Sequence, residues 1–206
     1  MSQTLRRDWP AVRQRAGEAM AVACEQGFPQ ILWLGAIMNG RALMESGQME
    51  EGIAQIEEGV SARKAIGVNI ALLFELALLA EARGMADRIE AGLDALTEAH
   101  EFATSNAEGF CLPEIHRVRG ELLRRQDEHN AMADAERCFR LGLDIARHQR
   151  AKSLELRTAS SLARLWRDQG KTADARDLLA PVYGWFTAGF DTTDLLEARA
   201  LLDELQ

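Results

Sequence analysis

The chain has 206 residues, a formal net charge of −8, 47% hydrophobic residues and 27% charged residues. These fractions are typical of a folded protein and exclude intrinsic disorder, because the apolar content is high enough to build a core. Three widely spaced cysteines exclude a disulfide framework. The longest apolar stretch, 70–80, is interrupted by Glu75 and is too short for a membrane span, and the N-terminus lacks the apolar segment of a signal peptide. We therefore expect a cytoplasmic protein with no membrane partner.

Charge is distributed unevenly along the chain. Residues 1–103 carry a net charge of −6, whereas residues 113–176 carry +4, from 14 Lys and Arg against 10 Asp and Glu. Overall acidity argues against binding of nucleic acid, so we expect no nucleic-acid partner. The basic stretch is compatible with a small anionic partner.

Apolar residues recur at three- and four-residue spacing along nearly the whole chain, and the alternation typical of β-strands is absent. This pattern predicts ten helices with short connections: 10–26, 29–46, 49–66, 69–84, 87–104, 112–126, 131–149, 152–169, 172–187 and 193–205. Gly27, Gly47, Gly67 and Gly170 follow predicted helix ends, where a left-handed cap suits glycine. Pro181 lies inside a predicted helix and should kink or end it.

The predicted helices form pairs, and the pairs repeat. Small residues recur at corresponding positions, where they let paired helices approach closely, and the larger residue four positions on fills the space between pairs. These positions are Gly40, Ala80, Gly120 and Ala163 in the first helices, and Gly52, Gly92, Ala135 and Ala175 in the second. The spacings of 40 to 43 residues predict an all-α fold, a right-handed superhelix (α-solenoid) of antiparallel helix pairs.

We predict one helical-repeat domain over residues 1–206. It would comprise a leading helix at 10–26, pairs at about 29–66, 69–104, 112–149 and 152–187, and a C-terminal capping helix at 193–205. The small–large–small pattern, with Gly47-Gln48 and Gly170-Lys171 at the turns, resembles tetratricopeptide repeats (TPRs). The period is longer than the usual 34 residues, and the tryptophan and closing proline of those repeats are missing from their usual places.

In TPR-like stacks the first helix of each pair lines a concave groove. The resemblance therefore implies a groove that is apolar and acidic at one end and rich in arginine at the other. The partner-binding residues that it implies are Arg41, Glu81, Arg117, Glu121, Arg124, Arg157, Arg164 and Arg167. Arginine forks suit carboxylates and phosphates, so we expect a protein or an acidic peptide as the partner. The alternative is a solvated face with pairs within one helix, such as Glu121–Arg125 and Arg164–Asp168.

A second resemblance covers nearly the whole chain. Segments 151–157, 161–170, 178–186 and 189–191 resemble the C-terminal helical-repeat region of large bacterial predicted ATPases, and 27–33 and 52–56 resemble the same region further upstream. Many of those proteins are fused to nucleotide-cyclase domains, and others to DNA-binding domains. The resemblance implies a sensory or protein-binding arm, because the cyclase and ATPase residues of that family have no matching positions here.

Gly170-Lys171-Thr172 is similar to the end of a phosphate-binding loop. Leu165 occupies the place of the earlier glycine that such a loop needs, so we interpret the segment as a turn between helices. Cys111 lies in a connection between helices, and we expect it to be partly exposed. No nucleophile and base are recognisable, so we predict no enzymatic activity and no cofactor.

His129, Cys138 and His148 could together suggest zinc. Ten helical residues separate Cys138 from His148 by about 15 Å, which is too far for one ion to bridge. We expect Cys138 to pack between helices beside Phe139, and His148 to lie on a wet face, so we predict no metal site.

Four aromatic residues gather near the end of the chain: Tyr183, Trp185, Phe186 and Phe190. They could form a docking patch for a partner helix or an apolar ligand. We favour a closing core under helix 193–205, because the end of a solenoid needs a cap.

The sequence thus predicts a non-enzymatic scaffold that binds protein or peptide in a concave groove. We expect it to be a regulatory or sensory arm of a multidomain ATPase or of an adenylate or guanylate cyclase signalling protein. Two alternatives stay open: a small-molecule sensor with its ligand near Trp33, Phe74 and Met44, and a self-association module that forms a homo-oligomer.

Overall fold

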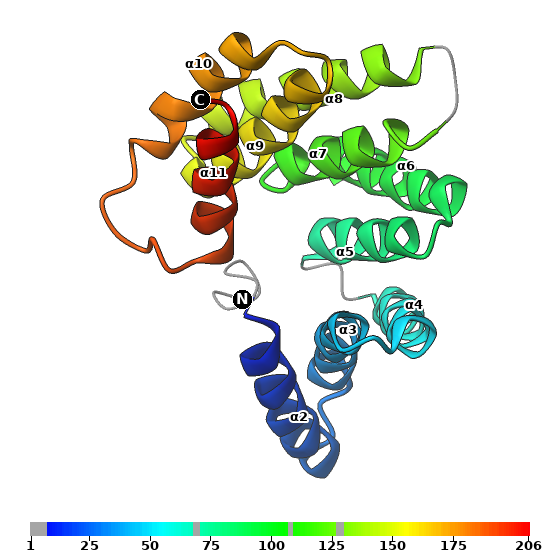
Figure 1. Cartoon of the computed structure of the whole chain (residues 1–206). Helices are drawn as coiled ribbons and strands as arrows, with labels where there is room; N and C mark the ends of the chain where they lie inside the picture. The colour runs from blue at the N-terminus through cyan, green and yellow to red at the C-terminus, as the bar shows by residue number, and fades with distance from the viewer. Residues whose placement is uncertain (1–7, 68–70, 107–108, 127–129) are drawn as a thin grey trace. The chain divides into compact units, whose positions relative to one another are not determined.

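A computed structural model describes residues 8–67, 71–106, 109–126 and 130–206 (Figure 1). Within these ranges it contains ten α-helices and no β-strand. The helices are α2 (Trp9–Gln26), α3 (Pro29–Glu45), α4 (Met49–Ala65), α5 (Leu72–Met85), α6 (Ile89–Asn106), α7 (Leu112–Leu123), α8 (Ala131–His148), α9 (Lys152–Asp168), α10 (Thr172–Tyr183) and α11 (Thr193–Glu204). The predicted all-α fold of helix pairs is confirmed.

Most of the predicted helix boundaries agree with the structure to within a few residues. Helix α10 differs by four residues, because it ends at Tyr183 and the prediction extended to 187. Pro181 explains the early end, since proline lacks the N–H that would continue the helical hydrogen bonds. Gly27, Gly47 and Gly170 have φ angles of 69°, 89° and 77°, the left-handed conformation expected after a helix end. The turn predicted at 170–172 is also confirmed.

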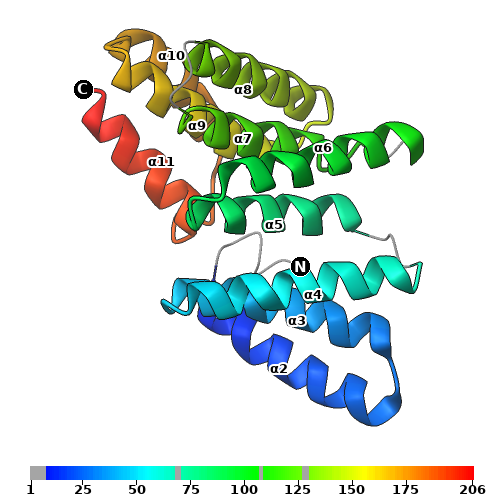
Figure 2. The same ribbon diagram turned by 90° about the vertical axis from the view of Figure 1, so that its right-hand side faces the viewer.

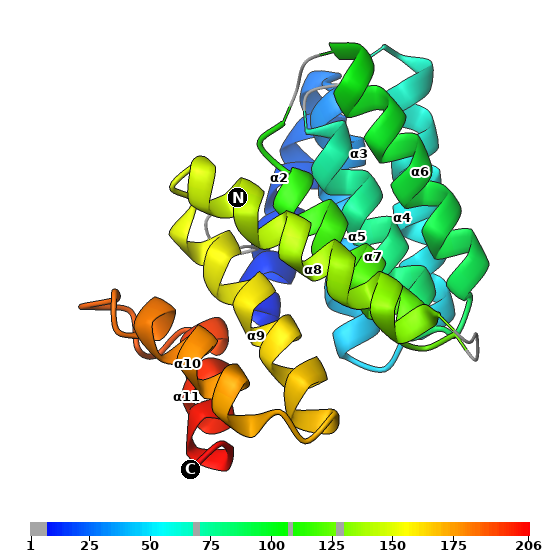
Figure 3. The ribbon, with the colours of Figure 1, turned by 90° about the horizontal axis from the view of Figure 1, so that it is seen from above.

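The chain divides into two compact units, residues 1–102 and residues 103–206. In the first unit, α3 packs against α2 and α4, and α5 contacts both α3 and α4 (Figure 2). In the second unit, α7 packs against α8 and α9, and α9 also packs against α8, α10 and α11 (Figure 3). The single domain over residues 1–206 stays a prediction. No helix in the described part of the chain is long and apolar enough to cross a membrane.

Two facing glycines set the close packing of α3 against α4. A Cβ atom on Gly40 would lie 2.6 Å from the carbonyl oxygen of Gly52, and a Cβ on Gly52 would collide with the carbonyl oxygen of Gly40. Because these oxygens belong to the backbone, a larger residue would force one helix to move. The close approach predicted from the repeat of small residues is confirmed here.

Gly120 and Phe139 show the same principle between α7 and α8. The ring of Phe139 is fully buried, and its Cδ1 atom would lie 2.7 Å from a Cβ on Gly120. Phe139 is the larger residue four positions after Ala135, and it fills the space that the glycine leaves open. The repeat pattern marked both residues, but it placed the larger one between pairs, whereas Phe139 fills the space beside Gly120 within one pair.

The C-terminal core forms between α9, α10 and α11. Its buried residues include Leu156, Ala159, Ala163, Ala175, Leu179, Leu195, Ala198 and Leu201. Tyr183 and Phe186 pack against this cluster, in agreement with the predicted closing core. Trp185 and Phe190 differ, because 57% and 45% of their surfaces are exposed.

Candidate partner-binding face

The eight residues predicted to bind a partner are divided between the two units. Arg41 and Glu81 lie in the first unit, on α3 and α5. The other six lie in the second unit: Arg117 and Glu121 on α7, Arg124 directly after α7, and Arg157, Arg164 and Arg167 on α9. The structure therefore brings these six together on α7, at the residue that follows it, and on α9, and the two helices pack against each other.

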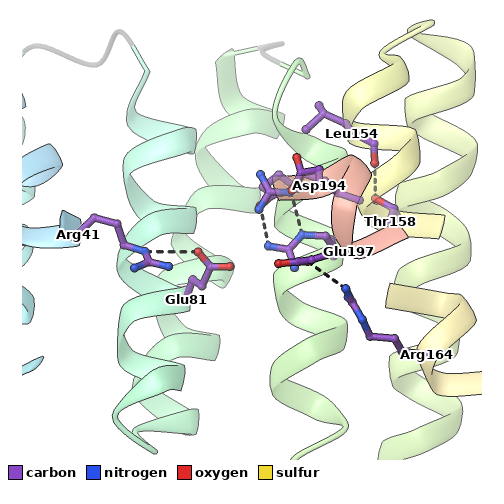
Figure 4. Close-up of polar contacts among 10 residues, drawn as sticks. Arg41, Glu81, Leu154, Thr158, Arg164, Asp194 and Glu197 are labelled. Carbon is purple, nitrogen blue, oxygen red and sulfur yellow. Dashed lines mark hydrogen bonds and ion pairs between the residues drawn. The ribbon is translucent and has the colours of Figure 1, made fainter. Parts of the chain in front are cut away.

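Arg41 lies beneath other side chains and is only 3% exposed. Its Nη1 atom donates a hydrogen bond to Glu45 at 2.5 Å, and its Nε lies 3.8 Å from Oε2 of Glu81 (Figure 4). Its guanidinium also stacks on the ring of Trp9, with 4.4 Å between the Cζ atom and the ring centroid. A partner would therefore meet the carboxylates of Glu45 and Glu81, which are partly exposed, before it met the arginine.

Buried ion pairs connect α7 to α9. The guanidinium of Arg117 donates two hydrogen bonds to Glu114, at 3.0 and 2.7 Å, and both side chains are buried. Arg157 on α9 reaches the same carboxylate, with 2.9 Å between Nη2 and Oε1. One carboxylate thus holds arginines from both helices, and this pairing fixes their register.

A second connection lies at the C-terminal end of α7. Nε of Arg124 is 3.2 Å from Oε2 of Glu121, and its Nη1 is 3.8 Å from Oδ2 of Asp168 on α9. Between a quarter and a half of each of these three side chains is exposed. They are accessible to a partner while remaining paired with one another.

The capping helix α11 supplies three carboxylates to α9. We call Arg157, Arg164 and Arg167 the arginine row, and Asp194, Glu197 and Glu204 the acid row. Nη2 of Arg164 lies 3.1 Å from Oε2 of Glu197, and Nε of Arg157 lies 4.0 Å from Oδ1 of Asp194. Arg167 pairs with Glu204. Figure 4 shows α11 with Asp194 and Glu197 directed toward α9.

Arg167 also donates hydrogen bonds to its neighbour Asp168, at 2.9 and 3.1 Å. This hydrogen bonding, together with the bond to Glu204, raises the pKa of Arg167 above its ordinary value. As for any arginine, the guanidinium is charged at physiological pH, and 35% of its side chain is exposed. Such a group recognises carboxylates as a fixed cation.

The acid row was not among the residues predicted from the sequence, where helix 193–205 was interpreted only as an apolar cap. A signal was nevertheless present, because the carboxylates follow a spacing of 3 and 7 residues and the arginines a spacing of 7 and 3. Both rows therefore span ten residues of helix, which corresponds to about 15 Å. Arg164, moreover, reaches across to Glu197 on α11, and not along its own helix to Asp168 as the alternative reading had it.

A hollow of about 510 Å³ lies at another surface of the second unit. Its lining consists of Glu136, Arg140, Trp166, Lys171, Asp174, Asp177 and Leu178. Arg140 pairs with Glu136 at 2.6 Å and stacks over Trp166. Burial alone would raise the pKa of Glu136, but the hydrogen bonds from Arg140 and Trp166 and the charges of Arg140 and Lys171 together outweigh it, so the pKa is lowered. The lining carries two cations and three carboxylates, so it favours neither an anionic nor a cationic ligand.

Cys138 and His148, which were considered for metal chemistry, lie on α8. Among the described residues, no group of three or more His, Cys, Asp and Glu side chains could hold a metal ion, and His129 lies outside the described residues. Cys138 is half-buried, and burial raises the pKa of its thiol, while His148 is exposed. These two placements are as expected.

The expectation of a partly exposed Cys111 is wrong, because the residue is 5% exposed. Cys111 forms the N-cap of α7, and its carbonyl oxygen accepts hydrogen bonds from Glu114 and Ile115. The residue thus belongs to the folded start of the helix and not to an open connection.

The small-molecule site left open by the sequence would lie near Trp33, Phe74 and Met44. Met44 is 3% exposed and packs against Gly52 of α4, so its side chain fills space between two helices. Trp33 and Phe74 are half-buried. Met44 is therefore part of the core of the first unit.

No family model matches the chain. An uncharacterized protein of Rhizobium meliloti (strain 1021) is 27% identical over 135 residues. The match covers 62% of this chain and 13% of that relative, so the chain spans a small part of the curated relative's length.

Three solved structures resemble the chain at 11 to 15% sequence identity. Bacillus thuringiensis PlcR, in complex with the peptide PapR7 and DNA, has a TM-score of 0.76, and the alignment covers 99% of this chain and 70% of PlcR. BtubC of P. vanneervenii has a TM-score of 0.68, with 98% and 89% covered. A Podosopora anserina putative kinesin light chain with nearly identical TPR-like repeats has a TM-score of 0.54, with 99% and 96% covered. At this level of identity the likeness shows a TPR-like helical-repeat fold.

Proposed function

We propose that this chain is a non-enzymatic helical-repeat scaffold that binds an acidic peptide, or the acidic surface of a partner protein, on the face formed by α7, α9 and α11. The observation that carries the proposal is the arginine row. Arg164 and Arg167 have side chains that are 30% and 35% exposed, and both already bind carboxylates of another helix. A row of arginines that binds three carboxylates in this way has the chemistry needed to recognise an acidic ligand.

The comparison with PlcR supports a peptide as the ligand. PlcR has a similar fold and was solved with a peptide and DNA bound. Between these two ligand classes, the net charge of −8 on this chain favours the peptide, because DNA binding depends on neutralising phosphates with an excess of cations. We therefore keep the prediction of a protein or peptide partner without nucleic acid.

We further propose that the scaffold is a regulatory arm of a larger bacterial signalling protein in the cytoplasm, of the ATPase or cyclase kind. The resemblance of the last 60 residues to the repeat region of predicted ATPases motivates this assignment. The relative from Rhizobium meliloti is consistent with it, because the matched segment makes up only 13% of a much longer chain. An arm of this kind would couple partner binding to a domain elsewhere in the protein.

A display library of 15-residue peptides, sorted on the purified chain, tests the binding proposal. Peptides rich in Asp and Glu should be enriched on the wild type and lost on the variant Arg124→Glu, Arg164→Glu, Arg167→Glu. The matched control is Arg137→Glu, Arg150→Glu, Arg176→Glu, which makes the same charge change at exposed positions away from this face. Circular dichroism checks that both variants remain helical. If peptides rich in Asp and Glu were still enriched on the first variant, these arginines would not belong to the binding face.

A further inference from the structure

Helix α11 has two faces with different partners. Its apolar residues Leu195, Ala198 and Leu201 are at most 4% exposed and complete the C-terminal core. Its acid row, defined above, runs along one edge of this apolar face and pairs with the arginine row of α9. A solenoid cap needs only the first of these faces, because its task is to cover apolar surface. The second face therefore calls for a separate explanation.

The two rows match in length and in order. Arg157 pairs with Asp194, Arg164 with Glu197 and Arg167 with Glu204, so the pairs follow the same sequence along both helices. A single helix thus presents three carboxylates, in the same order along its axis, to three arginines of its neighbour. This is the geometry expected of an acidic amphipathic helix bound to a basic surface.

The fit of α11 to this surface is incomplete. Ser160 lies between Arg157 and Arg164 on the same stripe of α9, is 5% exposed, and its hydroxyl oxygen has no hydrogen-bond partner. Buried polar groups are normally paired, whereas this hydroxyl beside the arginine row has no partner. The Arg157–Asp194 distance of 4.0 Å is also long for an ion pair. A different helix with a polar side chain opposite Ser160 would satisfy the surface better.

The connection to α11 allows such a replacement. Residues 184–192, between α10 and α11, contain no helix and include Gly184 and Gly189. Nine residues in an extended form can reach about 30 Å, so α11 could leave α9 while remaining attached to the chain.

We propose that α11 is an internal ligand, which occupies the arginine row until an acidic amphipathic helix of a partner protein displaces it. The partner helix would carry carboxylates at positions i, i+3 and i+10, and small or apolar residues at i+1, i+4 and i+7, as α11 itself does. This inference rests on the proposed function, and it adds both the form of the ligand and a competitor within the chain. The arginines of α9 would recognise the carboxylates of the partner helix, and the apolar surface exposed when α11 leaves would recognise its apolar residues.

The test uses the full chain and a fluorescein-labelled peptide with the sequence of residues 190–206, followed by fluorescence anisotropy. The variant Asp194→Asn, Glu197→Gln, Glu204→Gln keeps the apolar face of α11 but removes the charges that compete for the arginine row. This variant should bind the peptide at least tenfold more tightly than the wild type. Adding Arg164→Glu and Arg167→Glu should abolish the binding. The control Asp174→Asn, Asp177→Asn, Asp203→Asn removes three carboxylates outside the acid row, two on α10 and one on α11, and should bind as the wild type does.

The outcomes separate the internal ligand from the proposed function. Suppose that the wild type and the acid-row variant bind the peptide with equal affinity, and that the arginine substitutions abolish this binding. That result would contradict the proposal that α11 is an internal ligand, but it would still support a scaffold that binds acidic peptides. If neither protein bound the peptide while both melted cooperatively, both proposals would fall. Hydrogen exchange gives a second readout, because the amides of residues 194–204 in the wild type should exchange faster once the peptide is bound. Slower exchange there would show that the peptide binds without displacing α11.

Discussion

The two units of the chain place their most informative arginine–carboxylate pairs in different surroundings. Residues 1–102 carry a net charge of −6, and their best-buried pair, Arg63–Glu75, lies in the core with side chains 4% and 0% exposed. Residues 103–206 carry a net charge of −2 and place most of their pairs on one face, between α7, α9 and α11. The residue types are the same, but the exposed fraction of their side chains differs.

This difference decides what each pair contributes. Removing one member of a buried pair leaves an uncompensated charge in a medium of low polarity, so such pairs matter greatly for stability once they exist. A pair at the surface contributes little to stability, because water solvates its members equally well when they are apart. The first unit therefore holds a fully buried pair in its core, whereas the face of the second unit also carries partly exposed pairs, such as Arg164–Glu197, that are free to serve recognition.

The largest effect should come from the buried pair of the first unit. Nε of Arg63 lies 2.8 Å from Oε1 of Glu75, and its Nη1 donates to the carbonyl oxygen of Gln30 at 2.7 Å. Arg63→Met should reduce the free energy of unfolding by about 3–5 kcal/mol, because Glu75 would remain buried without its partner. The double variant Arg63→Met, Glu75→Met should recover much of this loss. Urea unfolding followed by circular dichroism measures both, and a loss below about 1 kcal/mol for Arg63→Met would contradict the assignment.

A smaller effect is expected at the contact between α3 and α4. Gly40→Ala would place a Cβ against the backbone of Gly52, and overpacking of this kind costs about 1–3 kcal/mol. Gly17→Ala is the matched control, because no atom lies within 4 Å of its added Cβ. Alanine is the better helix former, so the control should stabilise the chain by about 0.5–1 kcal/mol. Thermal melting would contradict the close contact if both substitutions shifted the transition in the same direction.

These packing features were predictable from the sequence because they are local or periodic. The positions of Gly40, Gly52 and Gly120 follow from repeats of about 40 residues, and the end of α10 follows from Pro181. Each of these residues acts through its own backbone or through the helix that it pairs with. One sequence is therefore enough to place them.

The charged contacts were much less predictable. Arg41 was assigned to a groove by its position in the repeat, but it lies beneath Trp9 of a helix that the repeat pattern does not describe. The partners of Arg164 and Arg167 lie 33 and 37 residues away, on the capping helix. Which carboxylate meets which arginine depends on the rotation and register of two helices, and an apolar period fixes these only approximately. The equal length of the two rows could have indicated the match.

The buried pair also predicts a pH dependence of stability. Desolvation by burial raises the pKa of Glu75 above its ordinary value of 4.5, and this effect exceeds the lowering by Arg63. A folded-state pKa above the unfolded one contributes stability that is complete below the unfolded value and is lost as the pH rises through the folded value. Glu75→Gln has no such titration. The melting temperature of the wild type minus that of Glu75→Gln should therefore fall as the pH rises above 4.5, and an increase would reverse the assigned direction.

The smallest effect on stability should come from the pairs on the face of the second unit. Arg164→Ala removes the contact with Glu197, yet 30% and 39% of the two side chains are exposed, so the free energy of unfolding should change by less than about 1 kcal/mol. The same substitution should weaken binding of acidic peptides, because it removes one fork of the arginine row. A double-mutant cycle with Glu197→Ala in urea unfolding measures the pair directly. A coupling energy for Arg164–Glu197 as large as that of Arg63–Glu75 would show that the exposed pair contributes as much to stability as the buried one. The contrast between the two kinds of pair would then not hold.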